Sequence, residues 1–408
     1  LSFDLSGEAA KPGQALVAAS GMANVRGEQA DILDFVSTVE PRSFDYIIAH
    51  GVYAWVPPLV QQSVLALVGK ALSDSGVAFI SFNALPGGHV RRVMRDMLLH
   101  ALQDVAGIDE RIVAARAFLE GYAQRQDGDD AVVSAMRAQA VAMLGRPDAV
   151  LFHDGLGECL NPVSLSGSCA DAAGQGLEFL ADSGGNRLRD GLLPPDDEGT
   201  SAETAAIVRR AQDDDYAAMR FFRQALFVRA GRAPLRRPQA PCLADCHAAG
   251  QFASDGEGGL TVRDTTFALR DEGLTSWLLA LGEGWPRHRP IAELGDDPDR
   301  WDALIRLFNM GLLHITNAHE PFRLVPDERL EASPLARAQI AIGSPHVTTL
   351  HFEQMRLEDE AARGLIAALD GTRGRDALEQ VWDGLPHVPG LGLDQALEMI
   401  AAQRLLMR

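Results

Sequence analysis

The sequence contains few cysteines, no long apolar run and few aromatic residues. Its 408 residues include four cysteines, too few for the disulfide framework of many secreted proteins. No apolar run reaches the roughly 18 residues that a membrane-spanning helix needs, and the N-terminal residues lack the basic and apolar regions of a signal peptide. The sequence therefore predicts a cytoplasmic protein with reduced thiols and no insertion into a membrane.

Basic residues are outnumbered by acidic ones. The chain has 37 Lys and Arg against 56 Asp and Glu, a formal net charge of −19. A surface this negative repels phosphate backbones and anionic lipid, which argues against nucleic acid as a partner. Hydrophobic residues make up 47%, as is usual in globular proteins, and the length predicts two or three domains.

One short cluster has the composition of a metal site. Cys242, Cys246 and His247 form a C-x3-C-H pattern, but a zinc site needs a fourth ligand and none is obvious nearby. The segment is rich in Pro and Ala, which is typical of a loop. We therefore predict no bound metal.

Strand-like and helix-like stretches alternate over the first hundred residues. This alternation is typical of an α/β fold, in which crossover helices join the strands of a parallel sheet. The expected strands are Leu1–Leu5, Val25–Ile32, Phe44–His50 and Gly76–Phe82, and the expected helices are Ala15–Ser20, Pro58–Leu72 and Val90–Asp104.

The middle of the chain changes character. Asp109–Gly145 is rich in Ala and reads as helix with a break at Gly128, and Ile207–Arg229 also reads as helix. Between them we expect a helix at Ser164–Ala173 and a strand at Leu177–Ala181. The stretch Asp182–Gly199 is rich in Gly, Asp and Pro and marks a loop, and Pro234–Pro241 reads as a linker.

The C-terminal third contains a weak repeat of three helices followed by a strand. Trp301–Phe308 precedes the strand-like Met310–Thr316, and Leu393–Gln403 precedes Arg404–Met407. The repeat predicts paired winged-helix-like units. Neither copy has a basic recognition helix, so we favour contact with protein over DNA. The domain boundaries predicted in this way are 1–108, 109–235 (with 164–182 returning to the sheet) and 242–408.

Ligands of such sheets bind at the carboxyl ends of the strands. Asp4 ends the first expected strand and Asp31 ends the second. A carboxylate at Asp4 can accept both ribose hydroxyls of a nucleoside, while Asp31 can accept its adenine amino group and Ile32 can pack on the ring. The alternative is that each Asp only caps a helix or a turn.

The third expected strand ends in His50-Gly51-Val52-Tyr53-Ala54-Trp55. Gly51 allows a close approach of backbone to ligand. Tyr53 and Trp55 can form an aromatic wall for a sulfonium or ammonium group, worth roughly 0.5–2 kcal/mol, or can pack under the next helix. His50 can take a proton from a nucleophile or bond a backbone carbonyl. Asn83, at the end of the fourth strand, can hold a substrate nitrogen or hydroxyl.

These stretches resemble a known family. FDYIIAHGVYAWVPP, GVAFISFNALPGGHVRRVMRDM and, more loosely, LFHDGLGECLNPV are similar to bacterial class I S-adenosylmethionine-dependent methyltransferases with a methyltransferase regulatory domain, a group that includes rickettsial protein-lysine methyltransferases. The resemblance is clear over Ser2–Val163. It implies a Rossmann-like cofactor domain, a helical middle domain, a C-terminal domain, S-adenosylmethionine as cofactor and protein lysine as a substrate.

The resemblance also implies roles for single residues. Asp4 matches the ribose-binding acid and is followed by Leu5, Asp31 and Ile32 match the adenine-side pair, and His50 with Gly51 matches the cofactor edge. The acceptor pocket would then be shaped by His50, Tyr53, Trp55 and Asn83.

The sequence departs from the family pattern in three places. The family has a strand and a glycine-rich loop before the position of Leu1, so we expect a truncated methyltransferase domain. Family members tend to have Trp where Gly88 stands, and Pro12 falls inside a helix that is usually continuous, at a cost of roughly 3 kcal/mol. A catalytically weakened protein that binds or regulates a partner is therefore the alternative, and a transcription regulator is a third possibility. The methyl acceptor and the oligomeric state stay open.

Overall fold

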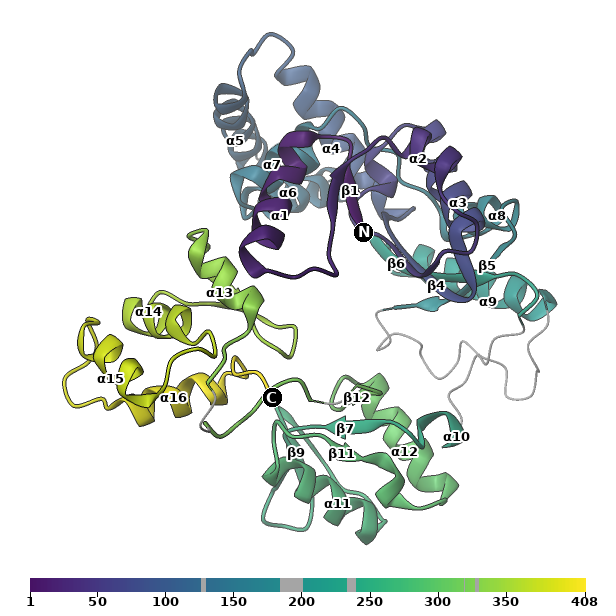
Figure 1. Cartoon of the computed structure of the whole chain (residues 1–408). Helices are drawn as coiled ribbons and strands as arrows, with labels where there is room; N and C mark the ends of the chain where they lie inside the picture. Colours follow the sequence, from purple (N-terminus) through teal and green to yellow (C-terminus); the bar gives the residue numbers. More distant parts are fainter. Residues whose placement is uncertain (126–129, 184–200, 233–239, 319, 327–329) are drawn as a thin grey trace. The chain divides into compact units, whose positions relative to one another are not determined.

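The computed structural model describes residues 1–125, 130–183, 201–232, 240–318, 320–326 and 330–408 (Figure 1). The chain forms two compact units. The sheet unit is Ile32–Pro238, and the split unit joins Leu1–Asp31 to Gln239–Arg408. The predicted break at Gly128 and most of the predicted loop 182–199 and linker 234–241 lie outside the described residues.

The sheet unit is built on four strands in the order β3-β4-β6-β5 (Figure 1). β3 and β4 are parallel, whereas β6 runs antiparallel to both β4 and β5. The α/β class expected from the sequence is confirmed. The strands are β3 (Phe44–Ala49), β4 (Leu72–Asn83), β5 (Leu177–Asp182) and β6 (Phe222–Arg229).

One face of this sheet carries the main core. Ala78, Ile80 and Phe82 alternate along β4 and are almost completely buried, as expected for one face of a strand. Burial of each large apolar side chain contributes roughly 1.5–3 kcal/mol. The helices that complete this core are α3 (Pro58–Ala71), α8 (Leu165–Ala173) and α9 (Ser201–Ala217), and the short α2 (Ile32–Thr38) adds Ile32 at its edge.

The prediction of a helix across Ile207–Arg229 is wrong in its second half. The helix α9 ends at Ala217, and Phe222–Arg229 is the strand β6. The inward positions of β6 are Arg223, Ala225 and Phe227. A charged residue at a buried position hides the two-residue alternation by which a strand is recognised.

A helical bundle follows β4 and has its own core. Met94, Leu98, Leu119 and Leu151 are among its buried residues. Asp130 caps the third helix by accepting from Val132 and Val133. The helices are α4 (Gly87–Ala101), α5 (Ile108–Gln124), α6 (Ala131–Leu144) and α7 (Asp148–Leu156).

The split unit begins with a parallel strand pair, β1 (Ser2–Asp4) and β2 (Gly27–Gln29), joined by helix α1 (Gly7–Ser20). Ser6 caps the start of α1, and Gly21 ends it with a left-handed φ of 68°, which glycine adopts without strain. The helix continues through Pro12, so the proline does not break it.

The C-terminal part of the split unit contains two modules, each with its own core. The first contains α10 (Ala240–Leu243), β7 (His247–Ala249), β8 (Ala253–Ser254), β9 (Leu260–Val262), β10 (Thr265–Phe267), α11 (Glu272–Glu283), β11 (Arg289–Pro290), the 3-10 helix η2 (Ile291–Leu294), α12 (Pro298–Asn309) and β12 (His314–Thr316). The second contains α13 (Pro334–Ala341), β13 (His346–Thr348), β14 (Gln354–Arg356), α14 (Glu360–Ala368), α15 (Arg375–Asp383) and α16 (Leu393–Ala402).

Both copies of the predicted helical repeat are present in these modules. α11, η2 and α12 precede β12, and α14, α15 and α16 precede Leu406 and Met407, which form single β-bridges with Ala332 and Phe322. The sequence did not reveal α13 or the β13–β14 hairpin, whose strands are only three residues long.

Candidate functional site

The carboxyl ends of β3 and β4 lie side by side because these strands are parallel neighbours. His50, directly after β3, is exposed, and its Nδ1 lies 2.9 Å from Ser81 Oγ on β4. Gly51 N donates to the same Ser81 Oγ at 2.9 Å. Phe79 and Phe222 flank the imidazole, with ring centroids at 5.8 and 6.4 Å. Ser81 thus fixes the direction of the His50 ring, a role that sequence reasoning missed.

Tyr53 begins a short 3-10 helix, η1 (Tyr53–Trp55). Its side chain is 2% exposed and packs against Phe82, with ring centroids 6.1 Å apart. Burial raises the pKa of the Tyr53 hydroxyl, and the charges of Asp171 and Cys169 raise it further. The phenol therefore stays protonated, and its place in the core fits the packing alternative.

Trp55 is half-buried and meets a residue of the helical bundle. Its ring centroid lies 4.9 Å from that of His153 on α7, and His153 Nδ1 lies 2.9 Å from Asp154 Oδ1. Aromatic pairs at this spacing contribute roughly 0.5–1.5 kcal/mol beyond burial. Sequence reasoning did not select His153. The signal that could have found it is the LFHDG stretch, which contains His153 and loosely resembles the family.

Asn83 ends β4 and is 3% exposed. Its backbone oxygen accepts from Val163 N at 3.1 Å, which brings a segment between α7 and α8 to the end of the strand. In that segment Asn161 bonds the η1 turn, and so does Gln61 of α3. Neither residue was selected from the sequence, since an Asn before a Pro and a Gln inside a helix are common in proteins without such a role.

Gly88 has a steric reason to be glycine in this fold. A Cβ atom added at Gly88 would lie 2.6 Å from Cβ of the buried Pro162. Real Cβ atoms do not approach carbon so closely, so the Trp of the family pattern does not fit beside Pro162. The departure at Gly88 is thus accommodated locally by the packing of the segment 160–163.

Of the remaining predicted cofactor residues, Asp4, Leu5 and Asp31 lie in the split unit. Because β1 and β2 are parallel and Ala30 N donates to Asp4 O, Asp4 and Asp31 come together at one edge of the strand pair. Asp4 is exposed, and its Oδ1 accepts from Ser6 N at 2.8 Å. Leu5 is 68% exposed, whereas Ile32 begins α2 in the sheet unit. The predicted cofactor residues are thus divided between the two units.

A cavity of about 610 Å³ lies elsewhere in the sheet unit, between α8, α9 and β5. Cys169, Val208 and Gln212 are among its lining residues, and none of the predicted site residues lines it.

No group of three or more His, Cys, Asp or Glu in the described part of the chain is arranged to hold a metal ion. Cys246 Sγ lies 3.9 Å from Cys242 O.

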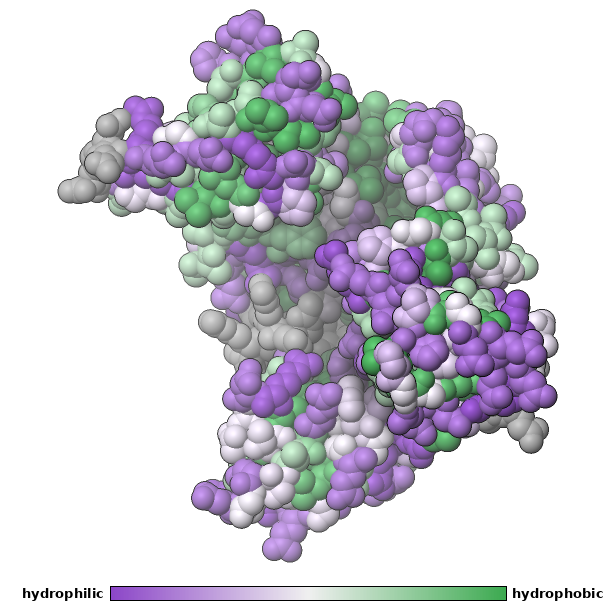
Figure 2. Space-filling view, turned by 90° about the vertical axis from the view of Figure 1, so that its left-hand side faces the viewer, coloured by the Kyte–Doolittle hydropathy of each residue, from purple (hydrophilic) through white to green (hydrophobic). Residues whose placement is uncertain are grey.

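The described helices include none that is long and apolar enough to cross a bilayer. Hydrophilic and hydrophobic residues are interspersed over the face drawn in Figure 2.

Two family models match the sequence. Residues 147–229 match the predicted methyltransferase regulatory domain, and residues 328–382 match the C-terminal winged helix domain of PKMT. The first match covers α7, α8, β5, α9 and β6, and the second covers α13 to α15. The resemblance found in the sequence and the expected winged-helix module are confirmed.

Solved structures extend the comparison to almost the whole chain. The structure of PKMT2 from Rickettsia typhi matches with a TM-score of 0.77 at 19% identity, over 99% of this chain and 88% of that one. The chain has the PKMT2 fold. A second PKMT2 structure, in complex with AdoHcy, matches with a TM-score of 0.76 at 20% identity, over the same shares.

Sequence relatives are longer than the part they share with this chain. An uncharacterised protein of Rickettsia prowazekii, RP789, is 30% identical over 211 residues, which is 52% of this chain and 38% of the relative. Another, RP028, is 28% identical over 159 residues, which is 39% of this chain and 63% of the relative. The chain thus spans less than two thirds of the length of each.

Proposed function

We propose that this chain is part of an S-adenosylmethionine-dependent class I methyltransferase that methylates a protein side chain such as lysine. The observation that carries the proposal is the shared end of β3 and β4, where Ser81 holds both His50 and Gly51 in a fold whose PKMT2 representative was solved with AdoHcy. A cytoplasmic location remains the expectation drawn from the sequence.

The exposed carboxylates of the split unit fit a nucleoside. One carboxylate oxygen of Asp4 accepts a hydrogen bond from Ser6 N. Because a carboxylate has about four lone-pair sites, Asp4 can still accept hydrogen bonds from ribose hydroxyls. Asp31 stands at the same edge for the adenine side. When bound, S-adenosylmethionine supplies a methyl group on a positively charged sulfur, which an amine lone pair can displace.

The residues of the β3–β4 end would then act on the acceptor. His50 has one ring nitrogen beside Ser81 Oγ. With the proton on that Nδ1, donated to Ser81, the lone pair of Nε2 can take a proton from an ammonium group. We assign Trp55 and Asn83 to the acceptor pocket and Tyr53 to the core that supports it. Orientation of the amine, rather than covalent chemistry by the chain, supplies most of the rate.

Binding of the cofactor product tests this proposal first. We would titrate the 408-residue chain with AdoHcy in a calorimeter, together with the same chain carrying any native residues that precede Leu1 in its gene. The proposal predicts a dissociation constant on the order of micromolar, lost in Asp4→Ala and kept in Glu28→Ala, which changes an exposed acid on β2. Absence of binding by both chains would reject the cofactor and with it the enzyme.

The second candidate is a methyltransferase-like protein that binds or regulates a partner. Both matched family models lie after residue 146, in the regulatory and winged-helix segments, which favours a role outside catalysis. Under this candidate AdoHcy does not bind, and Asp4→Ala leaves partner capture unchanged.

A further inference from the structure

The segment Leu160–Val163 is bonded to the end of β4. Val163 N donates to Asn83 O at 3.1 Å, and Leu85 N donates back to Val163 O at 3.0 Å. These bonds form a single parallel bridge between Ala84 and Val163. Arg92 of α4 also donates to Leu160 O at 3.0 Å. The segment therefore has a fixed place beside Asn83.

The same segment holds the aromatic turn after β3. Asn161 N donates to Ala54 O at 2.7 Å, and Asn161 Nδ2 donates to Val56 O at 3.0 Å. Gln61, which is 9% exposed, donates from Nε2 to Tyr53 O at 2.7 Å and to Asn161 O at 3.0 Å. Asn161 thus contacts the turn with its backbone and its side chain. Gln61 links Asn161 to the turn, because its amide donates to both Asn161 O and Tyr53 O.

The turn has little internal support. It is a 3-10 helix of three residues without a side-chain cap, and such short helices have poor hydrogen-bond geometry. Carbonyl groups that are shielded from water need partners, and those of Tyr53, Ala54 and Val56 find them in Gln61 and Asn161. The position of the turn relative to Asn83 thus depends on side chains from outside it.

We propose that Asn161 is a positioning residue of the candidate site, whose side-chain amide keeps the Tyr53–Val56 turn in place beside Asn83. The consequence for catalysis rests on the proposed function, whereas the placement of the turn does not. Asn161 contacts Ala54 and Val56 and acts on the reaction only through the turn.

The isosteric variant Asn161→Asp isolates the side-chain bond. It leaves the backbone bonds of residue 161 in place and puts a carboxylate oxygen opposite Val56 O, where two acceptors repel each other. At about pH 8 the turn should move. Asn24→Asp, at an exposed residue of the split unit, is the matched control.

Tryptophan NMR reads the turn directly. Trp55 is the one tryptophan of the sheet unit, and the other four, at positions 277, 285, 301 and 382, lie in the split unit. With 5-fluorotryptophan, the Trp55 fluorine resonance, assigned by Trp55→Phe, should shift or broaden in Asn161→Asp at about pH 8, whereas it should keep the wild-type position in Asn24→Asp.

A Trp55 resonance in Asn161→Asp identical to that of the wild type would overturn the proposal. The second pair of variants is Gln61→Met, which removes both bonds of the buried amide, and Gln62→Met on the exposed side of the same helix. Only the first should move Trp55. Changed resonances of the other four tryptophans would report general unfolding and would count against a positioning role.

Methylation of poly-L-lysine with S-adenosylmethionine tests the consequence for catalysis. In Asn161→Asp, kcat/KM for this probe should fall at least about tenfold, while the AdoHcy dissociation constant changes less than about threefold. Equal kcat/KM in both proteins overturns the role in catalysis. If the wild type neither binds AdoHcy nor methylates the probe, the proposed function fails, and the Trp55 resonance alone decides the placement of the turn.

Discussion

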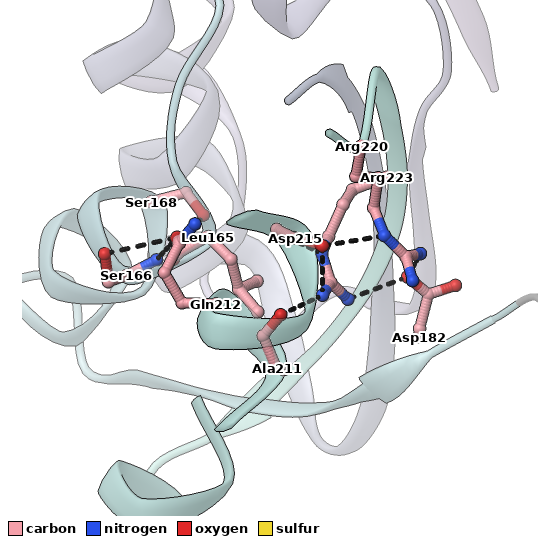
Figure 3. Close-up of polar contacts among 9 residues, drawn as sticks. All are labelled: Leu165, Ser166, Ser168, Asp182, Ala211, Gln212, Asp215, Arg220 and Arg223. Atoms are coloured by element: carbon pink, nitrogen blue, oxygen red, sulfur yellow. Dashed lines mark hydrogen bonds and ion pairs between the residues drawn. The ribbon is translucent and has the colours of Figure 1, made fainter. Parts of the chain in front are cut away.

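Asp215 and Arg223 form a two-point ion pair inside the sheet unit (Figure 3). Arg223 Nε and Nη2 each lie 2.8 Å from one carboxylate oxygen of Asp215, and the two side chains are 0% and 4% exposed. Burial raises the pKa of the Asp215 carboxyl, while the hydrogen bond and charge of Arg223 oppose that rise. Arg223 also reaches Asp182 at 3.0 Å and Ala211 O at 2.8 Å. The pair thus connects α9, β5 and β6.

Asp215→Asn should destabilise the chain strongly. The amide cannot accept both Arg223 donors and leaves the buried guanidinium with Asp182 as its remaining charged partner. Breaking a buried ion pair by removing one partner costs about 3–5 kcal/mol. Urea unfolding measures the loss, and Asp213→Asn, an exposed residue two positions away, should change the midpoint little. Equal midpoints for the two variants would mean that the ion pair contributes no net stability.

Gly88→Ala should also destabilise the chain. The added Cβ meets Pro162 at 2.6 Å, and forced overpacking typically costs about 1–3 kcal/mol. Gly121→Ala, on α5, is the control, because a Cβ there meets nothing within 4 Å and glycine inside a helix costs roughly 0.5–1 kcal/mol relative to alanine. The two variants should therefore shift the urea midpoint in opposite directions, and a shift of the same sign would contradict the crowding at Gly88.

Acid should weaken the split unit through a histidine cluster. The His351 ring centroid lies 5.9 Å from that of His288 and 5.4 Å from that of His314. Both ring nitrogens of His288 are buried without a hydrogen-bond partner. Burial lowers the pKa of His288, against the opposing charge of Glu320. Burial and the charge of Arg404 lower the pKa of His351, against Glu353.

The sign of the pH dependence follows from these directions. Each histidine binds a proton more readily when unfolded, so its stabilising contribution is complete above the ordinary pKa of about 6.5 and is lost as the pH falls. Stability should drop by up to about 1.4 kcal/mol per pH unit for each histidine in that window. Urea midpoints between about pH 8 and pH 5 measure the slope, and it should be shallower in a variant with both His288→Asn and His351→Asn. An unchanged slope would exclude the cluster as its source.

The cysteines should differ in reactivity. Burial raises the pKa of the Cys169 thiol to about 12, whereas Cys242 is exposed. Because the thiolate is the reactive form, iodoacetamide at about pH 8 should label Cys242 at least roughly tenfold faster than Cys169, as read by peptide mass spectrometry. Rapid labelling of Cys169 in the folded chain would show that its surroundings open on the time scale of the reaction.

Much of the architecture could be predicted because the relevant signals are local. The strands β3 and β4 and the helices α3 and α12 follow from β-branched runs, apolar periodicity and a proline at the first turn. The strand β6 was assigned to a helix because Arg223 occupies a buried position, and its partner Asp215 is identified only by the fold. The periodicity of apolar residues does not reveal an ion pair between side chains of two different elements.

The sequence predicts the residues of the candidate site that follow strands, but not those that act through contacts between distant segments. His50 and Asn83 could be chosen because they follow strands, but Ser81, Gln61 and Asn161 act through contacts that only the folded chain creates. The sequence also could not decide between the two interpretations of Tyr53, since an aromatic ring after a strand is equally suited to a binding wall and to a core. Its 2% exposure favours the core.

The regulatory match also bears on how the chain can be divided. Residues 147–229 supply β5 and β6, which are two of the four strands in the sheet unit. Excising them would strip β4 of one neighbour along Ala78–Asn83 and open its apolar face to water. Such a segment cannot be transferred between proteins as an independently folding domain. A partner that binds this segment would instead act on the pairing between β4 and β6, which ends where Asn83 lies opposite Phe222.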